Sequence, residues 1–501
     1  MSLLKKLAGQ AALYGLSSML GRALNFLLVP FYTAILFPAE FGAITEMYAY
    51  VAFLNIIYLY GMETAYFRFS TKEGFNERET YNNAQTLLLF SSALFSGALI
   101  LFAQPLAEIL QYPEKSSYIV WLSLILGIDA IVAIPFAKLR LEKKAAFFAS
   151  AKLLNIFLNI GFNIFFLVVC RDISNGEYLT EYKNTIDAFY KTGMDVEYVF
   201  ISNLLANVVM IPVLWKQFFI YRLRFDLKEI GPMLKYAYPL MFMGLAGMVN
   251  EMLDRVMLKH ILPENFYNGI SNAEALGIYG ACYKLSMFMT LAVQAFRYAA
   301  DPFFFSQAKD KNAPELFSKV MKWFIIVCCF IFLFVSLNID LFGLILRNSV
   351  YRQGLMVVPV LLLANLFLGI YYNLSVWYKL TDKTYYGTFI SVGGALVTIL
   401  GNMLLIPLFG YMGAAYATLF CYFSMAVASY VLGNKYYPVP YNLKSATIYI
   451  GICTLMIVCF FSASFQNSIF KYSISISIVL LFGFLVFLLE KKDFFKLRTK
   501  N

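Results

Sequence analysis

Long apolar segments recur along the whole chain and constrain its fold more than any other feature. A helix needs about 20 apolar residues to cross the roughly 30 Å of hydrocarbon in a bilayer. About fourteen segments reach this length: 11–37, 41–62, 83–103, 118–137, 146–170, 196–215, 234–262, 275–298, 320–341, 355–378, 385–407, 411–432, 446–465 and 474–489. The loops between them are short and polar. We therefore predict an all-α integral membrane protein without a soluble domain.

The composition agrees with this prediction. Of the 501 residues, 61% are hydrophobic and 14% are charged, whereas soluble domains carry about 25% charged residues. The net charge of +11 is spread over short loops, so we expect no binding to nucleic acid. The seven cysteines show no C-x-x-C spacing and the chain has one histidine. These features predict neither a disulfide framework nor a His-based zinc site.

The distribution of basic residues predicts the orientation. With a cytoplasmic N-terminus, inside loops hold about 27 of the 40 Lys and Arg residues, outside loops about 9, and such an excess marks the cytoplasmic side. Both termini are therefore expected in the cytoplasm. Lys5 and Lys6 precede the first apolar segment without a cleavage site that leads into soluble sequence, which favours a retained span over a signal peptide.

A weak internal repeat suggests a duplicated architecture. Residues 25–44 resemble 250–263 together with 274–279. Both copies run from an asparagine to a proline, then to an acidic residue, a glycine and a new span. Six spans separate the copies, so both have the same orientation. Transporters built from such repeats bind their substrate between the halves, near the midplane; chance similarity between apolar segments is the alternative.

The repeat predicts three parts. Residues 1–225 would form an N-terminal lobe of six spans and residues 226–436 a C-terminal lobe of six. The lobes would be related by a pseudo-two-fold axis around a central cavity. Residues 437–501 would add a helix pair and a basic cytoplasmic tail.

Three charges lie together in the seventh predicted span. Glu251, Asp254 and Arg255 are spaced i, i+3 and i+4, which places them on one helix face. An ionised side chain in a bilayer costs roughly 2.5 to 3.5 kcal/mol. We expect this face to meet a partner or a water-filled cavity; a position among the headgroups, at the end of an overlong helix, is the alternative.

Other cations lie deep in predicted spans. Arg22 stands about a dozen residues into the first span, and its guanidinium keeps its charge, so Asp129 of the fourth span is its natural partner. Lys284 of the eighth span has Glu251 or Asp254 as candidate partners. We predict that Arg22, Lys152, Arg255 and Lys284 form a basic cavity for an anionic group such as a pyrophosphate. Buried ion pairs, or snorkelling of Lys152 to the interface, are the alternatives.

Acidic residues in spans are candidates for coupling to an ion gradient. Asp129, Glu251 and Asp254 are expected to exchange a proton or a sodium ion during transport. Glu46 and Glu63 lie near span ends, and we assign them structural roles. No other cofactor is predicted.

Polar residues and prolines complete the prediction. Asn25, Asn159 and Asn250 are expected to line a hydrophilic lumen, although interhelical hydrogen bonds are an alternative. Pro30 and Pro239, in the first span of each lobe, are candidate hinges because proline removes a backbone hydrogen bond.

Several motifs now identify a family. They are GRALNFLLVPFYTAILFPAEFG in the first span, GMETAYFRF after the second, GIYGACYKLS in the eighth, and IPLFGYMGAAYATL across the eleventh and twelfth. Together with the Asp254 and Arg255 pair, they resemble the polysaccharide biosynthesis and O-antigen flippase family (Wzx-type). That family shares a superfamily with the multidrug and toxin extruders and the lipid II flippase.

The resemblance implies a flippase without catalytic chemistry in the bacterial inner membrane. It would carry an undecaprenyl-pyrophosphate-linked oligosaccharide to the periplasmic leaflet by alternating access. Its partners would be membrane lipids and other polysaccharide-assembly proteins, and no nucleic acid. Arg22 matches a cavity-facing arginine of that group, and the last two spans would form a groove for the lipid tail. O-antigen, capsule and exopolysaccharide pathways all fit.

Departures from the pattern keep alternatives open. The lipid II flippases carry more arginines in their first two spans, and drug extruders have about twelve spans with an acid in the first. A cation-coupled multidrug exporter and a lipid II flippase are the alternatives within the superfamily. A glycan polymerase or ligase is the alternative from another class, but the largest outside loop has only about 25 residues.

Overall fold

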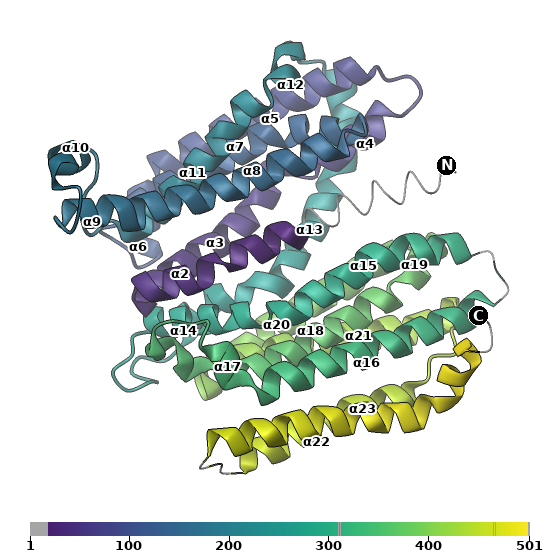
Figure 1. The fold of residues 1–501 in the computed structure, drawn as a ribbon. Coiled ribbons are helices and arrows are strands. Elements are labelled where there is room, and N and C mark those ends of the chain that lie inside the picture. Colours follow the sequence, from purple (N-terminus) through teal and green to yellow (C-terminus); the bar gives the residue numbers. More distant parts are fainter. Residues whose placement is uncertain (1–18, 309, 311, 464, 466, 499–501) are drawn as a thin grey trace. The chain divides into compact units, whose positions relative to one another are not determined.

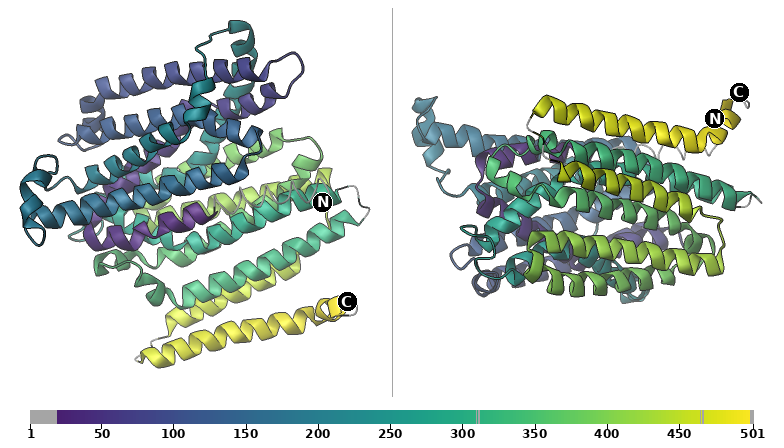
Figure 2. Two further views of the ribbon diagram at one scale, coloured as in Figure 1. Left: turned by 45° about the horizontal axis from the view of Figure 1, so that its top comes forward. Right: turned by 90° about the horizontal axis from the view of Figure 1, so that it is seen from below.

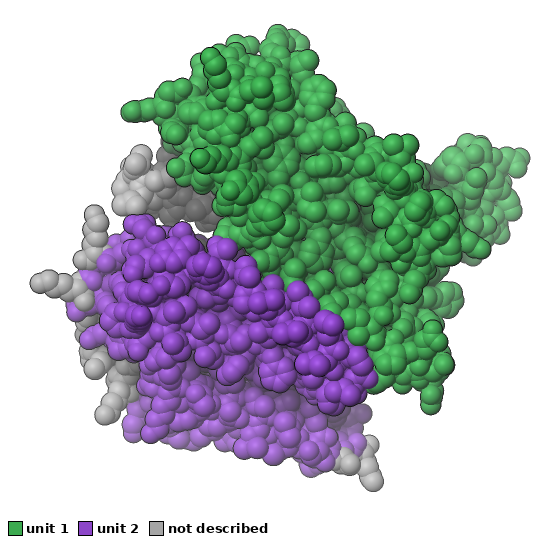
Figure 3. All heavy atoms as spheres, turned by 180° about the vertical axis from the view of Figure 1, so that it is seen from behind, with its two compact units in different colours: residues 1–280 green, residues 281–501 purple. Residues whose placement is uncertain are grey.

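The computed structural model describes residues 19–498 except 309, 311, 464 and 466, and the described residues form helices without strands (Figure 1). The chain divides into two compact units, Met1–Gly280 and Ala281–Asn501, coloured green and purple in Figure 3. The prediction of an all-α membrane protein is confirmed.

Unit 1 contains the helices before Gly280. In chain order they are α2 (Leu28–Ile35), α3 (Pro38–Leu59), α4 (Met62–Ser70), α5 (Glu77–Leu101), α6 (Ala103–Ile109), α7 (Ser116–Leu141), α8 (Ala145–Ile164), the π-helix η1 (Phe165–Cys170), α9 (Arg171–Ser174), the 3₁₀-helix η2 (Thr180–Tyr182), α10 (Lys183–Asp187), α11 (Asp195–Val213), α12 (Trp215–Ile220), α13 (Leu227–Ile261) and the first part of α14 (Asn272–Leu285).

Unit 2 contains the remaining helices. They are the end of α14, then α15 (Met287–Gln307), α16 (Ala313–Leu337), α17 (Ile339–Gly343), the 3₁₀-helix η3 (Ser349–Gly354), α18 (Val357–Leu374), α19 (Val376–Leu380), α20 (Tyr385–Phe409), α21 (Tyr411–Tyr436), α22 (Leu443–Ser462) and α23 (Ser468–Arg498).

The part of the chain that the structure describes contains fewer recognisable spans than predicted. Among the described residues, eleven helices are long and apolar enough to cross a membrane, or twelve if α14 and α15, bent by 45°, count as one broken span. The predicted first span lies partly outside the described residues, which leave the shorter helix Met19–Ile35. Helix α13 has 35 residues, but its charges reduce its apolar character. The predicted count of fourteen is therefore not confirmed.

Local signals explain where several helices begin. Pro38 opens α3, where its missing N–H costs nothing, and the Glu40 carboxylate accepts the Phe37 N–H at 2.8 Å. Asn76 and Asp226 accept backbone N–H groups at the starts of α5 and α13. These contacts satisfy donors that a helix start otherwise leaves unpaired.

Packing within each unit follows a simple order. In unit 1, α5 packs on α7, α7 on α11 and α11 on α8; in unit 2, α20 packs on α21, α21 on α18 and α18 on α16, which also contacts α22 and α23 (Figures 1 and 2). Large apolar side chains such as Phe389, Leu404 and Leu408 of α20 are exposed. An apolar surface of this kind is the one expected to face lipid.

Candidate functional site

The start of α3 lies unusually close to the start of α14. A Cβ atom on Gly42 would overlap the carbonyl oxygen of Ala273, and one on Gly277 would overlap that of Pro38. Because the obstructing atoms belong to the backbone, only glycine permits this approach. We call this pairing the glycine contact, and it includes Gly280, whose Cβ would lie 2.6 Å from the Thr45 hydroxyl oxygen.

The glycine contact joins the two copies of the predicted repeat. Both helices begin with a carboxylate that caps its own first turn, since Glu274 accepts the Ser271 N–H at 2.7 Å as Glu40 accepts that of Phe37. The contact thus connects the second span of the predicted N-terminal lobe to the eighth span of the predicted C-terminal lobe, within unit 1. The predicted lobe boundaries themselves stay a prediction.

A buried carboxylate lies one turn further along α3. Glu46 is fully buried; its Oε2 accepts from Lys259 Nζ of α13 at 3.0 Å and from the Tyr112 hydroxyl at 2.8 Å. Its Oε1 lies 2.9 Å from His260 Nε2 and 3.3 Å from the Tyr50 hydroxyl. We call these five residues the Glu46 cluster.

The cation of the Glu46 cluster is equally well held. Lys259 Nζ also donates to the Leu110 carbonyl at 2.7 Å and lies 3.5 Å from the centroid of the Tyr112 ring. Burial, together with the Glu46 carboxylate, holds the pKa of the Tyr112 phenol above its usual value, so this phenol remains a donor. A buried ion pair is stable only with such a complete set of partners.

Sequence reasoning missed the importance of this cluster. It assigned Glu46 a structural role near a span end, and the structure shows that Glu46 ties α3 to α13 and to the segment after α6. The available signal was the Lys259–His260 pair, which contains the single histidine of the chain at the same end of its span as Glu46. Glu63, the other acid treated this way, pairs with Arg140.

A second polar network crosses the middle of unit 1. Asp129 of α7 accepts from the Asn207 amide of α11 at 2.9 Å, and the Asn207 oxygen accepts from Asn155 of α8 at 2.9 Å. Asn203, one turn before Asn207, shares a hydrogen bond with it and donates to the Tyr48 hydroxyl of α3. Asn203 and Asn207 therefore link four helices, with the Asp129 carboxylate at one end of the network.

This network replaces the partner predicted for Asp129. Arg22 is exposed and forms no ion pair within the part of the chain that the structure describes. The two asparagines of α11 were not anticipated, although their i, i+4 spacing places them on one helix face.

The other predicted cations differ in their surroundings. Lys152 is exposed on α8, with its Nζ 4.2 Å from the centroid of the Phe136 ring. Lys284 is exposed on the part of α14 that belongs to unit 2, and its predicted pairing with Glu251 or Asp254 stays a prediction. Arg22, Lys152 and Lys284 thus keep accessible charges.

The face of α13 that carries three charges is mostly internal. Arg255 is buried; its guanidinium donates to the Glu251 carbonyl of its own helix at 2.8 Å and lies 3.9 Å from the Asp254 carboxylate. Asp254 is buried as well and accepts from the Tyr279 hydroxyl at 2.5 Å. Asn250 is buried, whereas Glu251 is exposed, and the predicted roles of both residues stay predictions.

The remaining predicted residues lie as follows. Asn25 is exposed, and Asn159 accepts from Asn163, whose oxygen accepts from the Tyr32 hydroxyl at 2.9 Å. A turn at Leu27 interrupts the helix three residues before Pro30, whereas α13 continues unbroken through Pro239. The hinge roles of both prolines stay predictions.

Unit 2 contains an apolar groove between α16, α18, α21 and α22. Its volume is about 470 Å³, and its walls include Ile325, Phe367, Ile370, Phe423 and Val427. Its lining is apolar over most of its length, as expected for a site that holds hydrocarbon.

One edge of this groove is charged. Lys322 of α16 lines it and donates to the Glu490 carboxylate of α23 at 2.5 Å. Glu490 also accepts from the Tyr449 hydroxyl of α22 at 2.7 Å. This ion pair fixes the last two helices to α16.

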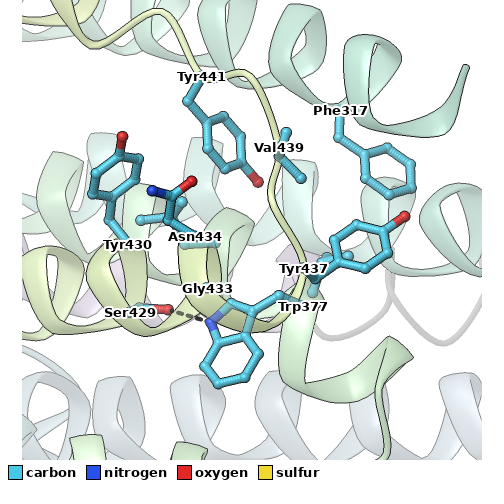
Figure 4. Close-up of a pocket in the computed structure, with 11 residues that line it drawn as sticks. Phe317, Trp377, Ser429, Tyr430, Gly433, Asn434, Tyr437, Val439 and Tyr441 are labelled. Carbon is cyan, nitrogen blue, oxygen red and sulfur yellow. Dashed lines mark hydrogen bonds between the residues drawn. The ribbon is translucent and has the colours of Figure 1, made fainter.

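A small pocket adjoins the groove and shares Leu374, Tyr430 and Tyr441 with it. Figure 4 shows this pocket, with Tyr430 and Tyr441 among the residues that line it. Its volume is about 10 Å³, which suits about one water molecule. The Trp377 indole N–H donates to the Ser429 hydroxyl at 3.3 Å beside it (Figure 4). Among the described residues, no group of three or more His, Cys, Asp and Glu side chains is placed to hold a metal ion.

Comparison with solved structures identifies the fold. The lipid II flippase MurJ in an inward closed conformation matches with a TM-score of 0.70 and 13% sequence identity, over 95% of this chain and 98% of that one. A multidrug resistance MATE family transporter of the MOP superfamily, in an inward-facing conformation, matches with a TM-score of 0.53 and 14% identity, over 87% and 94% of the two chains. A MATE transporter from Vibrio cholerae gives a TM-score of 0.52 and 14% identity, over 89% and 99%.

Comparison of sequences identifies the family. The model of the family described as polysaccharide biosynthesis protein matches residues 7–308, more than half of the chain. No curated protein matches the sequence. The chain therefore belongs to the polysaccharide biosynthesis protein family and has the fold of the lipid II flippase and the MATE transporters.

Proposed function

We propose that this protein is a flippase that moves an undecaprenyl-pyrophosphate-linked oligosaccharide repeat unit across the bacterial inner membrane. Both termini would lie in the cytoplasm, and the substrate would reach the periplasmic leaflet by alternating access of two six-helix lobes. Family membership and a transporter fold support this proposal, and no catalytic step is required.

One observation favours a lipid-linked substrate over a drug. The match to the lipid II flippase leaves 5% of this chain uncovered, about 25 residues, whereas α22 and α23 with their connection span 443–498. That match therefore includes part of the last helix pair. The MATE matches leave 10–14% uncovered, enough to omit most of the pair.

The groove beside this helix pair suits a lipid tail. Its apolar walls provide a surface for isoprenyl hydrocarbon inside the membrane. The Lys322 ammonium at its edge is paired with Glu490, so the groove itself would hold only the hydrocarbon.

Three accessible cations would bind the pyrophosphate during transport. Arg22, Lys152 and Lys284 retain this role in the proposal, whereas Arg255 is removed from it because its guanidinium is buried and bonded. Asn25 and Asn159 would contact the sugars. Asp129 stays a candidate for coupling to a proton or sodium gradient, since its carboxylate lies inside unit 1 and is hydrogen-bonded to Asn207 of the four-helix network.

The experiment that tests the proposal is deletion of the gene, followed by analysis of lipid-linked intermediates in each leaflet. Accumulation of a lipid-linked oligosaccharide in the cytoplasmic leaflet, reversed by the wild-type gene, is the expected result. Unchanged intermediates in both leaflets would overturn the proposal.

The same strain distinguishes the alternatives. Accumulation of lipid II instead of an oligosaccharide intermediate would identify a lipid II flippase. Greater sensitivity to hydrophobic cations, with normal intermediates, would identify a drug exporter.

A further inference from the structure

The connection between α8 and α11 folds into a small element of its own. We call residues 171–194 the hook; it contains α9, η2 and α10 and lies at the end of α8 (Figure 1). The α8 helix continues through η1 and α9 as one apolar helix, Ala145–Ser174, of 30 residues. At 1.5 Å per residue this helix is about 45 Å long, and a tilt of about 20° leaves about 42 Å across the membrane.

The length of this helix determines the depth of the hook. Lys143 and Lys144 directly before it are exposed, as expected of cations at one membrane surface. Because the hydrocarbon is only about 30 Å thick, the opposite end of the helix extends beyond it. The hook that follows therefore begins in the headgroup layer.

A stack of three rings holds the end of the hook at the depth of its beginning. Tyr198 of α11 stacks on Phe166 of η1, with ring centroids 5.1 Å apart, and on Tyr190 of the hook, 4.8 Å apart. The Lys191 N–H donates to the Tyr198 hydroxyl at 2.7 Å. The hook thus leaves unit 1 and returns to it at one level.

The hook has two apolar surfaces. The inner surface, formed by Ile173, Ile186 and Tyr190, is buried. The outer surface consists of four large side chains that are 39–53% exposed: Tyr178, Leu179, Tyr182 and Phe189. Exposed apolar surface of this kind marks a contact with a partner or a membrane.

The short α10 segment is amphipathic. Tyr182 and Phe189 stand four residues before and three residues after Ile186, a spacing that places all three on one helix face. Asn184, two residues after Tyr182, lies on the opposite side and is exposed. The apolar face of α10 is therefore covered by protein at Ile186 and only partly at its two edges.

The backbone at Leu179 is strained. This residue has φ of 48° and ψ of 41°, in the left-handed region, which is unfavourable for a leucine. Glycine or asparagine adopts this conformation more easily. Strained residues of this kind cluster where a protein contacts a ligand or partner, and the Leu179 side chain is 51% exposed.

The neighbouring helix shows what covers the outer surface. Leu154, Phe157 and Ile164 form an exposed apolar stripe on one side of α8, as expected of a face toward lipid. This stripe leads to the hook, and tyrosine and phenylalanine are enriched where such a face meets the headgroups.

We propose that the outer surface of the hook inserts into the headgroup layer of the bilayer and anchors unit 1 there. The hook carries three basic and four acidic residues, so the apolar side chains drive insertion and anionic lipids are not required. The inference does not depend on the proposed function; the proposed orientation only assigns the hook to the periplasmic leaflet.

The experiment compares spin labels on the two sides of α10. Tyr182→Cys or Asn184→Cys carries the label, in a chain with Cys459→Ser, because Cys459 is exposed and the other six cysteines are buried. The full-length protein is placed in nanodiscs of zwitterionic phosphatidylcholine. Relaxation of each label by oxygen, which concentrates in lipid, is compared with relaxation by a water-soluble nickel complex.

We expect the ratio of oxygen to nickel relaxation to be several-fold higher for the label that replaces Tyr182 than for the one that replaces Asn184. Adding Leu179→Asn should lower the ratio at Tyr182, because asparagine accepts the left-handed backbone but removes the apolar side chain. Thr192→Asn, a polar exchange in the hook outside the outer surface, is the matched control and should leave the ratio unchanged.

Two results would overturn the inference. Equal access of the nickel complex to both labels would place the hook in water. A label at Tyr182 that neither reagent reaches would show that protein, such as a second copy of this chain, covers the outer surface.

A measurement of folding keeps the comparison interpretable. Leu179→Asn should unfold at the wild-type temperature or higher, since it relieves strain, so a lower ratio at Tyr182 would not reflect unfolding. An unchanged ratio in this folded variant would contradict the role of Leu179 in insertion and overturn the inference. Because no glycan is present, these failures would leave the flippase proposal standing.

Discussion

The glycine contact makes a quantitative prediction for Gly277→Ala. The added Cβ would overlap the Pro38 carbonyl oxygen, whereas ordinary contacts lie at 3.4–4 Å. The obstructing atom is backbone, so no side chain can rotate away, and α3 and α14 must separate. We take the free-energy cost of this overlap as about 3 kcal/mol, the upper end for overpacked cores. Alanine stabilises a helix by about 1 kcal/mol relative to glycine, which offsets part of this cost.

The remaining cost of about 2 kcal/mol destabilises only the conformation in which α3 and α14 touch. The population of that conformation therefore falls by about 30-fold relative to conformations in which the two helices are apart. Spin labels that replace the exposed residues Glu114, after α6, and Glu264, after α13, report this shift, and thermal unfolding in detergent reports the loss of stability.

Gly247→Ala is the matched control, because nothing lies within 4 Å of a Cβ added at Gly247 on α13. It should keep the wild-type distances and unfold at the same temperature or slightly higher. If Gly277→Ala behaves like Gly247→Ala, the helices do not approach as closely as described and the reasoning is wrong.

Three further predictions concern the other charged and polar groups. Lys322→Met should lower the free energy of unfolding by about 3–5 kcal/mol because it leaves Glu490 buried without its cation. The double variant Lys322→Met/Glu490→Leu should recover most of this loss in thermal unfolding, and an equal loss of stability in the single and the double variant would contradict the pairing. Asn207→Leu should cost about 1–3 kcal/mol for each polar group left unpaired, more than Asn155→Ala, which removes one hydrogen bond of the network; the reverse order of unfolding temperatures would refute this. Arg22→Ala should abolish glycan export in the leaflet assay while its unfolding temperature stays at the wild-type value, and unchanged export would remove Arg22 from the binding site.

The sequence was sufficient to predict the class of fold and the family. Apolar segments of membrane length leave an all-α fold as the only solution for most of the chain, because a helix satisfies its own backbone in lipid. The motif ending in Glu40 and Gly42 and its counterpart with Glu274 and Gly277 also indicated a repeat, and both copies meet in the structure.

The polar contacts were harder to predict because they depend on which helices become neighbours. Spacing along α13 placed Asp254 and Arg255 on one face, but it did not reveal that the Tyr279 hydroxyl would donate a hydrogen bond to Asp254. Glu46 looked peripheral by its distance from a span end; its burial results from Tyr112 and Lys259, which are distant in the sequence. Arg22 was the predicted partner of Asp129, but the Asn207 amide of α11 donates its hydrogen bond and Lys152 of α8 is the cation that interacts with it.

The glycine contact has the form of a two-fold axis. Pro38 and Ala273, Gly42 and Gly277, and Thr45 and Gly280 are paired at one constant offset in the sequence, so each helix presents to the other the surface that it receives. Isologous surfaces of this kind are the ones that identical subunits use to form closed dimers. Two half-length chains that each carried this surface could therefore pair through it as a closed homodimer.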